Sequence, residues 1–75
     1  MHRALHQEHL AQVELQVAEC EKAVGGQREI VAELERGGLA VTQARRLLLF
    51  FEESLVMHVA DRDRLRKELG SEEVR

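Results

Sequence analysis

Apolar residues recur along the chain at alternating steps of three and four, which is the a/d heptad spacing of helices that pack as coiled coils. A first row with this spacing consists of Leu10, Val13, Val17, Cys20, Val24, Gln27, Val31 and Leu34. A second row consists of Ala44, Leu48, Phe51, Leu55, His58, Arg62, Leu65 and Leu69. The two rows predict two long helices, each with one face turned toward the other.

Glycines mark the point where the chain turns back. Gly37 and Gly38 separate the two rows, and Gly37 suits the left-handed position that follows many helix ends. Thr42 is a candidate N-cap for the second helix, and Gly70 is its expected end. The pattern therefore predicts an all-α fold, an antiparallel two-helix hairpin of coiled-coil type. We expect one domain, a hairpin that spans residues 1-75. It consists of helix 1 over about 3-36, a turn over 37-41, and helix 2 over about 42-69.

A second glycine pair, Gly25 and Gly26, interrupts the first helix. A glycine inside a helix costs about 1 kcal/mol relative to alanine, and a true break would shift the phase of the apolar row. Val24, Gln27 and Val31 instead remain in phase across the pair. We therefore expect one continuous helix, bent or straight, in preference to three shorter helices.

The two rows match in a single register. Folding the chain at residues 39 and 40 pairs each position of one row with one of the other: Leu34 with Ala44, Val31 with Leu48, Gln27 with Phe51, Val24 with Leu55, Cys20 with His58, Val17 with Arg62, Val13 with Leu65 and Leu10 with Leu69. On one flank this register places opposite charges face to face: Glu35 with Arg45, Arg28 with Glu52 and Glu14 with Arg66. Such pairs add little stability but specify register and orientation.

The other flank is apolar. There Ile30 faces Leu47 and Ala23 faces Ser54. On the same side of helix 2, a second stripe with helical spacing consists of Leu47, Phe50, Ser54 and Met57. One hairpin cannot bury a helix that is apolar nearly all round, so this flank predicts an interface. We expect a homodimer that forms a four-helix bundle through these residues: Ala23, Gly26, Ile30, Leu47, Phe50, Ser54 and Met57.

Composition narrows the function without naming it. The 75 residues have a formal net charge of −3 with both signs interleaved, which gives no basic footprint for nucleic acid. The longest apolar run, 47-51, is far shorter than the roughly 20 residues of a membrane span. A single cysteine excludes an intrachain disulfide and fits a reducing compartment. We expect a cytoplasmic protein that binds neither nucleic acid nor membrane.

Two sets of side chains are candidate metal ligands. Cys20 and His58 share one layer, and a dimer could bring together two sulfurs and two nitrogens, a set that zinc accepts. The alternative is a small buried thiol beside a histidine that is hydrogen-bonded to a carboxylate such as Asp61. His2, His6 and His9 share one helical face, where two histidines can hold a transition metal. The alternative there is a polar helix start, and neither metal site is favoured.

Catalytic chemistry finds no support in the sequence. There is no HExxH motif, phosphate-binding glycine loop or nucleophile elbow. His58 is followed by Val59 and the chain has no proline, unlike the usual phosphoacceptor histidines of dimeric four-helix bundles. Gln27 is interpreted as a buried polar residue that specifies register, and Arg62 as a side chain whose charged end reaches solvent.

The stretch QREIVAELERGG followed by ARRLLLFFEESLVMHVADRDRLRKEL resembles a group of small bacterial helical-hairpin proteins of unknown function. The resemblance covers about residues 18-69 and rests on these residues: Gln27, Arg28, Leu47, Leu48, Phe51, Glu52, Glu53, Ser54, His58, Asp61, Arg62, Asp63, Arg64 and Leu65. It implies a helical hairpin and no activity. A glycine often stands at the position of Cys20 in that group, so the resemblance does not support a role for this thiol.

These observations lead to two hypotheses from different classes. The first is a non-enzymatic, self-associating helical interaction module without a cofactor, whose partner is a second copy or another helical protein. The second is a small metal-responsive or signalling regulator that uses His58 and Cys20.

Overall fold

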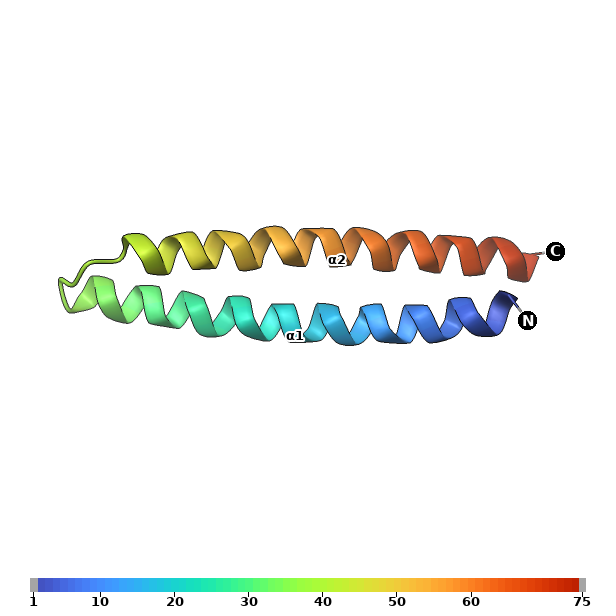
Figure 1. Ribbon diagram of the computed structural model, residues 1–75, viewed down its shortest axis with the longest axis horizontal. Coiled ribbons are helices and arrows are strands. Elements are labelled where there is room, and N and C mark those ends of the chain that lie inside the picture. Colours follow the sequence, from blue (N-terminus) through green and yellow to red (C-terminus); the bar gives the residue numbers. More distant parts are fainter. Residues whose placement is uncertain (1, 75) are drawn as a thin grey trace.

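The computed structural model describes residues 2-74 of the chain, which form two helices packed against each other. Helix α1 spans His2–Arg36 and helix α2 spans Thr42–Val74. The hairpin is a narrow rod with extents of 58 × 14 × 14 Å. The start of α1 and the end of α2 lie together at one end of this rod, and the turn lies at the other (Figure 1). The predicted all-α, two-helix hairpin is confirmed.

Helix α1 passes without interruption through Gly25 and Gly26. A β-carbon placed on either glycine would meet no atom within 4 Å, so both positions lie beside open space. The seam residues Val24, Gln27 and Val31 are all buried, which shows that the same face points inward on both sides of the pair. Packing of this face holds the helix together despite the two glycines.

Helix α1 ends in a Schellman motif. The amide of Leu39 donates to the carbonyl of Leu34 over 2.9 Å, and the amide of Gly38 donates to the carbonyl of Glu35 over 3.1 Å. Gly38 has a φ of +66°. The prediction that Gly37 takes the left-handed position is therefore wrong by one residue. Because α1 extends through Arg36, Gly37 is the C-cap and Gly38 is the first residue beyond it.

Two predicted features of α2 also require correction. The carbonyl of Val41 accepts the amide of Arg45 over 2.9 Å, which is the first helical bond and makes Val41, not Thr42, the N-cap. The helix continues through Gly70 to Val74, whereas an end at about residue 69 was expected. Leu69 is buried against the rest of the hairpin, and one exposed glycine costs only about 1 kcal/mol, which is too little to end the helix there.

The core is a single thin seam between the helices. Among the described side chains, the buried hydrophobic residues are Val13, Val17, Val24, Val31, Leu65 and Leu69. Val13, Val17 and Leu65 form one cluster, against which Leu10, Leu55 and Val59 pack. No described side chain is less than 2% exposed. A two-helix rod encloses its seam from only two sides, so the remaining hydrophobic residues stay partly in contact with solvent.

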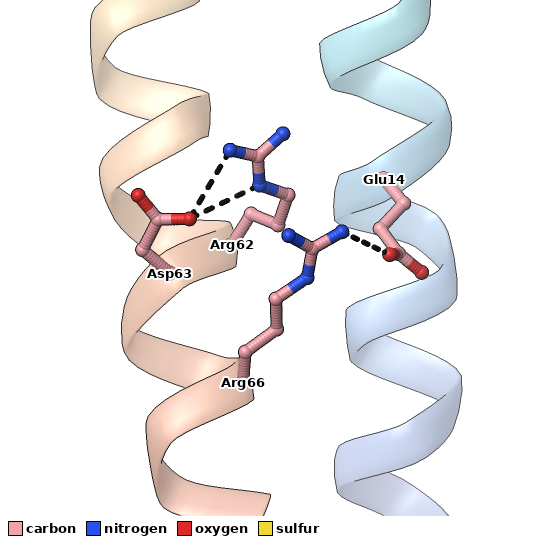
Figure 2. Close-up of polar contacts among 4 residues, drawn as sticks. All are labelled: Glu14, Arg62, Asp63 and Arg66. Carbon is pink, nitrogen blue, oxygen red and sulfur yellow. Dashed lines mark hydrogen bonds and ion pairs between the residues drawn. The ribbon is translucent and has the colours of Figure 1, made fainter.

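Three ion pairs along one flank establish the register. Arg28 Nη2 lies 3.1 Å from Glu52 Oε2, and Arg45 Nη2 lies 2.8 Å from Glu35 Oε1. The third pair joins Arg66 Nη2 and Glu14 Oε2 over 2.8 Å (Figure 2). All three pairings predicted from the sequence are therefore confirmed. Within the described part of the chain, no helix has a stretch apolar and long enough to cross a membrane.

Candidate interaction surface

The flank opposite the ion pairs is apolar in the half of the rod nearer the turn. Its large side chains are well exposed, with exposed fractions of 48% for Ile30, 44% for Leu47, 62% for Phe50 and 65% for Met57. The smaller residues complete it: Ala23 and Ser54 are half-buried, and Gly26 is exposed. We call these seven residues the apolar edge. They are the residues expected at a dimer interface, and the single chain leaves Phe50 and Met57 more than half exposed.

Helical periodicity explains why the two flanks differ. Ile30 directly precedes the buried Val31, whereas Arg28 directly follows the buried Gln27. With about 100° of rotation per residue, the positions just before and just after a seam residue lie on opposite flanks. In α2, Leu47 directly precedes the half-buried Leu48, and Glu52 directly follows the half-buried Phe51. The flank of Arg28 and Glu52 thus carries the interhelical ion pairs, whereas the flank of Ile30 and Leu47 carries the apolar edge together with the exposed Glu19 and Glu33.

The apolar edge is continuous with the seam at Phe50. The ring centroids of Phe50 and Phe51 lie 6.2 Å apart, with the ring planes tilted by 58°. Phe51 is half-buried, while Phe50 projects outward from the same turn of α2. Tilted aromatic pairs at this separation attract each other, which restrains the Phe50 ring on the surface.

Some exposed hydrophobic residues lie outside the predicted set. Leu5 precedes Gly26 by three heptads, so it continues the same flank of α1 toward the far end of the rod, and it is 63% exposed. Its heptad spacing was the signal that could have found it. Leu49 and Val56 are 56% and 68% exposed and lie further round α2. Leu49 and Val56 directly follow the seam residues Leu48 and Leu55, so they lie on the flank of the ion pairs and outside the apolar edge.

Gln27 is the one buried polar side chain among those described, with an exposed fraction of 7%. Its Nε2 donates to the carbonyl oxygen of Ala44 over 3.0 Å, so it crosses from α1 to α2. Arg62 is 24% exposed at its side chain and binds the neighbouring Asp63 through Nε and Nη2, at 3.2 and 3.1 Å (Figure 2). The charged end of Arg62 is thus held by a carboxylate at the surface.

The candidate metal ligands are spread along the rod. Cys20 and His58 are both half-buried, His6 is half-buried and His9 is exposed. The side chain of His2 lies outside the described residues. Among the residues that the structure describes, no group of three or more histidine, cysteine, aspartate or glutamate side chains is placed to hold a metal ion. A metal site built on Cys20 and His58 would therefore need ligands from another chain.

Comparison with family models, with curated proteins and with solved structures finds no match for this chain. The resemblance to small bacterial helical-hairpin proteins therefore stays a prediction.

Proposed function

We propose that this chain is a non-enzymatic, self-associating helical module of the cytoplasm, which dimerises into a four-helix bundle through its apolar edge. The observation that carries this proposal is the exposure of Phe50 and Met57 beside Leu47 and Ile30 on one flank of the rod. Contiguous apolar patches with this much exposed surface mark sites of protein association. A second copy supplies the same apolar chemistry and the same length of helix.

Surface area supports the same conclusion. The chain exposes 5877 Å². A compact monomer of 8.6 kDa exposes about 4,700 Å². The difference of about 1,200 Å² exceeds the roughly 800 Å² that each partner buries in a standard stable interface. Side-by-side packing of two rods would remove an area of that size and enclose the thin seam from further sides. It would therefore stabilise both the fold and the association.

The decisive experiment is the oligomeric state of the wild-type chain, measured by light scattering and sedimentation equilibrium at micromolar concentration. We expect a dimer, and Phe50→Glu is expected to give a monomer with reduced helicity. The substituted carboxylate would be buried without a partner, which costs several kcal/mol. Circular dichroism on the same samples should show the two losses together.

Leu15→Glu provides the matched control. Leu15 is 60% exposed, close to the 62% of Phe50, but it lies on the face of α1 that points away from both the seam and the apolar edge. We expect this variant to remain a dimer of full helicity. A fully helical wild-type monomer at micromolar concentration would disprove the proposal. Equal dissociation by both substitutions would place the interface elsewhere.

A further inference from the structure

The apolar edge is not uniform in side-chain size along the rod. Because the helices run antiparallel, a higher residue number lies nearer the turn in α1 and farther from it in α2 (Figure 1). The register that the ion pairs establish places Leu47 beside Ile30 and Ser54 beside Ala23. Phe50 precedes Ser54 by four residues in α2, so Phe50 lies closer to the turn than Ser54 does.

Two levels of the apolar edge therefore differ in bulk. The bulky level lies nearer the turn and consists of Ile30, Leu47 and Phe50. The small level lies next to it, away from the turn, and consists of Ala23, Gly26 and Ser54. The bulky side chains are 44% to 62% exposed, whereas a β-carbon placed on Gly26 would meet no atom within 4 Å. Large side chains thus project at one level, and open space lies beside the backbone at the other.

The two arrangements of a symmetric dimer treat these levels differently. A two-fold axis parallel to the rods preserves height, so it stacks the bulky levels of the two copies on each other and the small levels on each other. A two-fold axis across the rods, centred between the levels, reverses height and stacks each bulky level on the small level of the other copy. Only the second arrangement opposes large side chains with small ones along the whole contact, which favours close packing.

Each helix by itself indicates where such an axis would pass. An axis across the rods packs α1 against α1 and α2 against α2, each pair antiparallel. In α1, Ile30 opposes Ala23 of the other copy when the axis passes between residues 26 and 27. In α2, Phe50 opposes Ser54 of the other copy when the axis passes at residue 52.

We propose that two copies pack through their apolar edges with their turns at opposite ends, so that the bulky level of each copy covers the small level of the other. The axis positions indicated by the two helices coincide, because the ion pair between Arg28 and Glu52 joins α1 and α2 within two residues of both. One axis therefore suits both helices. This inference rests on the self-association proposed above and specifies its geometry.

The polar end of the same flank supports this orientation. Away from the turn, Asp61, Arg64 and Glu68 continue the flank of the apolar edge along α2. With turns at opposite ends, residues before about 14 in α1 and after about 64 in α2 extend beyond the turn of the other copy and stay in water. With turns at the same end, the polar ends of both copies would instead lie against each other.

The neighbour of Glu33 across the contact distinguishes the two orientations. Turns at opposite ends bring the exposed Glu33 of one copy toward the exposed Glu19 of the other. Turns at the same end would bring Glu33 toward Leu47, and Glu19 toward Asp61. Each orientation thus contains one approach of like charges, repeated by symmetry, and exposed charges repel weakly. The match of sizes therefore selects the orientation, and the charges provide a test of it.

An exchange of sizes within α1 tests the contact. Ala23 and Ile30 are seven residues apart, about 10 Å along one helix, so they do not touch within a chain. Ala23→Ile should raise the dimer dissociation constant by about tenfold or more, because it overpacks against Ile30 of the other copy, and Ile30→Ala should also raise it. The double variant exchanges the two sizes and should recover about tenfold or more of the lost affinity. Additive effects would overturn the contact.

Charge reversal at exposed positions provides a second arm, which does not depend on repacking. Glu33→Lys and Glu19→Lys should each lower the dissociation constant by about threefold to tenfold at low salt, because a repulsion becomes an attraction. The double variant restores like charges and should return to the wild-type value. Sedimentation equilibrium measures all these constants, and circular dichroism verifies that the variants are helical.

Glu29→Lys is the matched control for the charge arm. Glu29 is exposed on the outer face of α1, so the same change of charge there should shift the dissociation constant by less than about twofold. An unchanged constant in Glu33→Lys, or an equal shift in Glu29→Lys, would overturn the proposed orientation.

Spin labels measure the orientation directly. Glu8 and Glu29 are exposed and lie three heptads apart on the outer face of α1. We attach labels through Glu8→Cys or Glu29→Cys in a Cys20→Ala background. Turns at opposite ends should give interchain distances of about 50 Å or more at position 8 and about 25 Å or less at position 29. Turns at the same end would give nearly equal distances at the two positions.

The outcomes separate this inference from the proposed function. A monomeric wild-type chain would refute both together. A dimer with equal label distances at positions 8 and 29 would refute the orientation alone and leave the self-association in place.

Discussion

Arg66 and Glu14 lie 52 residues apart in the sequence, and their side chains meet with Nη2 2.8 Å from Oε2 near the open end of the rod (Figure 2). The pair joins the last third of α2 to the first half of α1. It shows that the register set near the turn by Glu35 and Arg45 is kept along the hairpin. A slip by one heptad would separate the partners of both pairs.

The first prediction is a measurable coupling between Glu14 and Arg66. Glu14→Arg and Arg66→Glu should each lower the free energy of unfolding by less than about 1 kcal/mol, and the double exchange should recover part of the loss. We expect a coupling of about 0.2–1 kcal/mol that falls as salt is added. Denaturant titration of the four proteins of the cycle measures it.

Arg46→Glu is the control for this cycle. Arg46 is exposed near the turn end of α2, far from Glu14. Combined with Glu14→Arg, it should show additive effects. A coupling as large as that of the true pair would mean that overall charge, and not the contact, is responsible.

The second prediction concerns the end of α1. Gly38→Ala should destabilise the hairpin by about 1–2 kcal/mol, because its φ of +66° brings an L-residue's β-carbon too close to the backbone. Gly37→Ala should be neutral or slightly stabilising, since its β-carbon would lie 3.5 Å or more from every neighbour. Thermal unfolding of the two variants at equal concentration compares them. A larger loss for Gly37→Ala would contradict the Schellman assignment.

The sequence predicted the seam and its register because both depend on periodic features. A step of three or four residues identifies one helix face, and three charge pairs in one register are hard to satisfy by accident. The local geometry of the helix ends was harder to predict from the sequence. Gly37 and Gly38 are the same residue type, so composition could not show which one takes the left-handed conformation. That choice depends on whether α1 ends at Arg36 or one residue earlier.

Helix length and assembly were harder to derive for a different reason. The end of α2 depends on the balance between the cost of Gly70, about 1 kcal/mol, and the larger stabilisation from burial of Leu69. The interface depends on surface that one hairpin leaves uncovered. Periodicity identified Phe50 and Met57 as apolar positions off the seam, but it carries no information on how a second copy would lie against them.

The third prediction concerns Gln27. Gln27→Leu should leave the free energy of unfolding unchanged or raise it by about 1 kcal/mol, because the carbonyl of Ala44 can still accept its own helical amide. Gln27→Ala should lower it by about 1–2 kcal/mol, since a space would remain in the seam. Denaturant unfolding distinguishes the two. Gln16 is exposed, so Gln16→Leu and Gln16→Ala should each change the free energy of unfolding very little.

A large decrease in the free energy of unfolding of Gln27→Leu would contradict this prediction. It would mean that the 3.0 Å bond from Gln27 to Ala44 stabilises the hairpin by more than burial of the amide costs. The coupling between Glu14 and Arg66 should be measured in this variant as well. If Gln27 specifies register, the coupling will shrink in Gln27→Leu even where stability is kept.

The last prediction separates the two hypotheses about His58. If His58 only fills the seam, His58→Leu will keep the helical fold, and the melting temperature of the wild type will not respond to zinc. A metal that binds only the folded state must raise the melting temperature, by an amount that grows with its concentration above the dissociation constant. Zinc titration after treatment with a chelator, followed by thermal unfolding, provides the measurement. We expect no rise in the wild type, in His58→Leu or in Cys20→Ala.

A zinc-dependent rise would be informative because the variants assign it to a place in the rod. Loss of the rise in both His58→Leu and Cys20→Ala would favour the metal-responsive regulator, with ligands shared between two copies, since one chain offers no group of three suitable side chains among its described residues. Zinc should then also tighten the dimer, because the site exists only when both chains are present. A rise that survives these changes but disappears in His6→Ala would instead assign zinc to the start of α1, where it would stabilise a helix end without linking the chains.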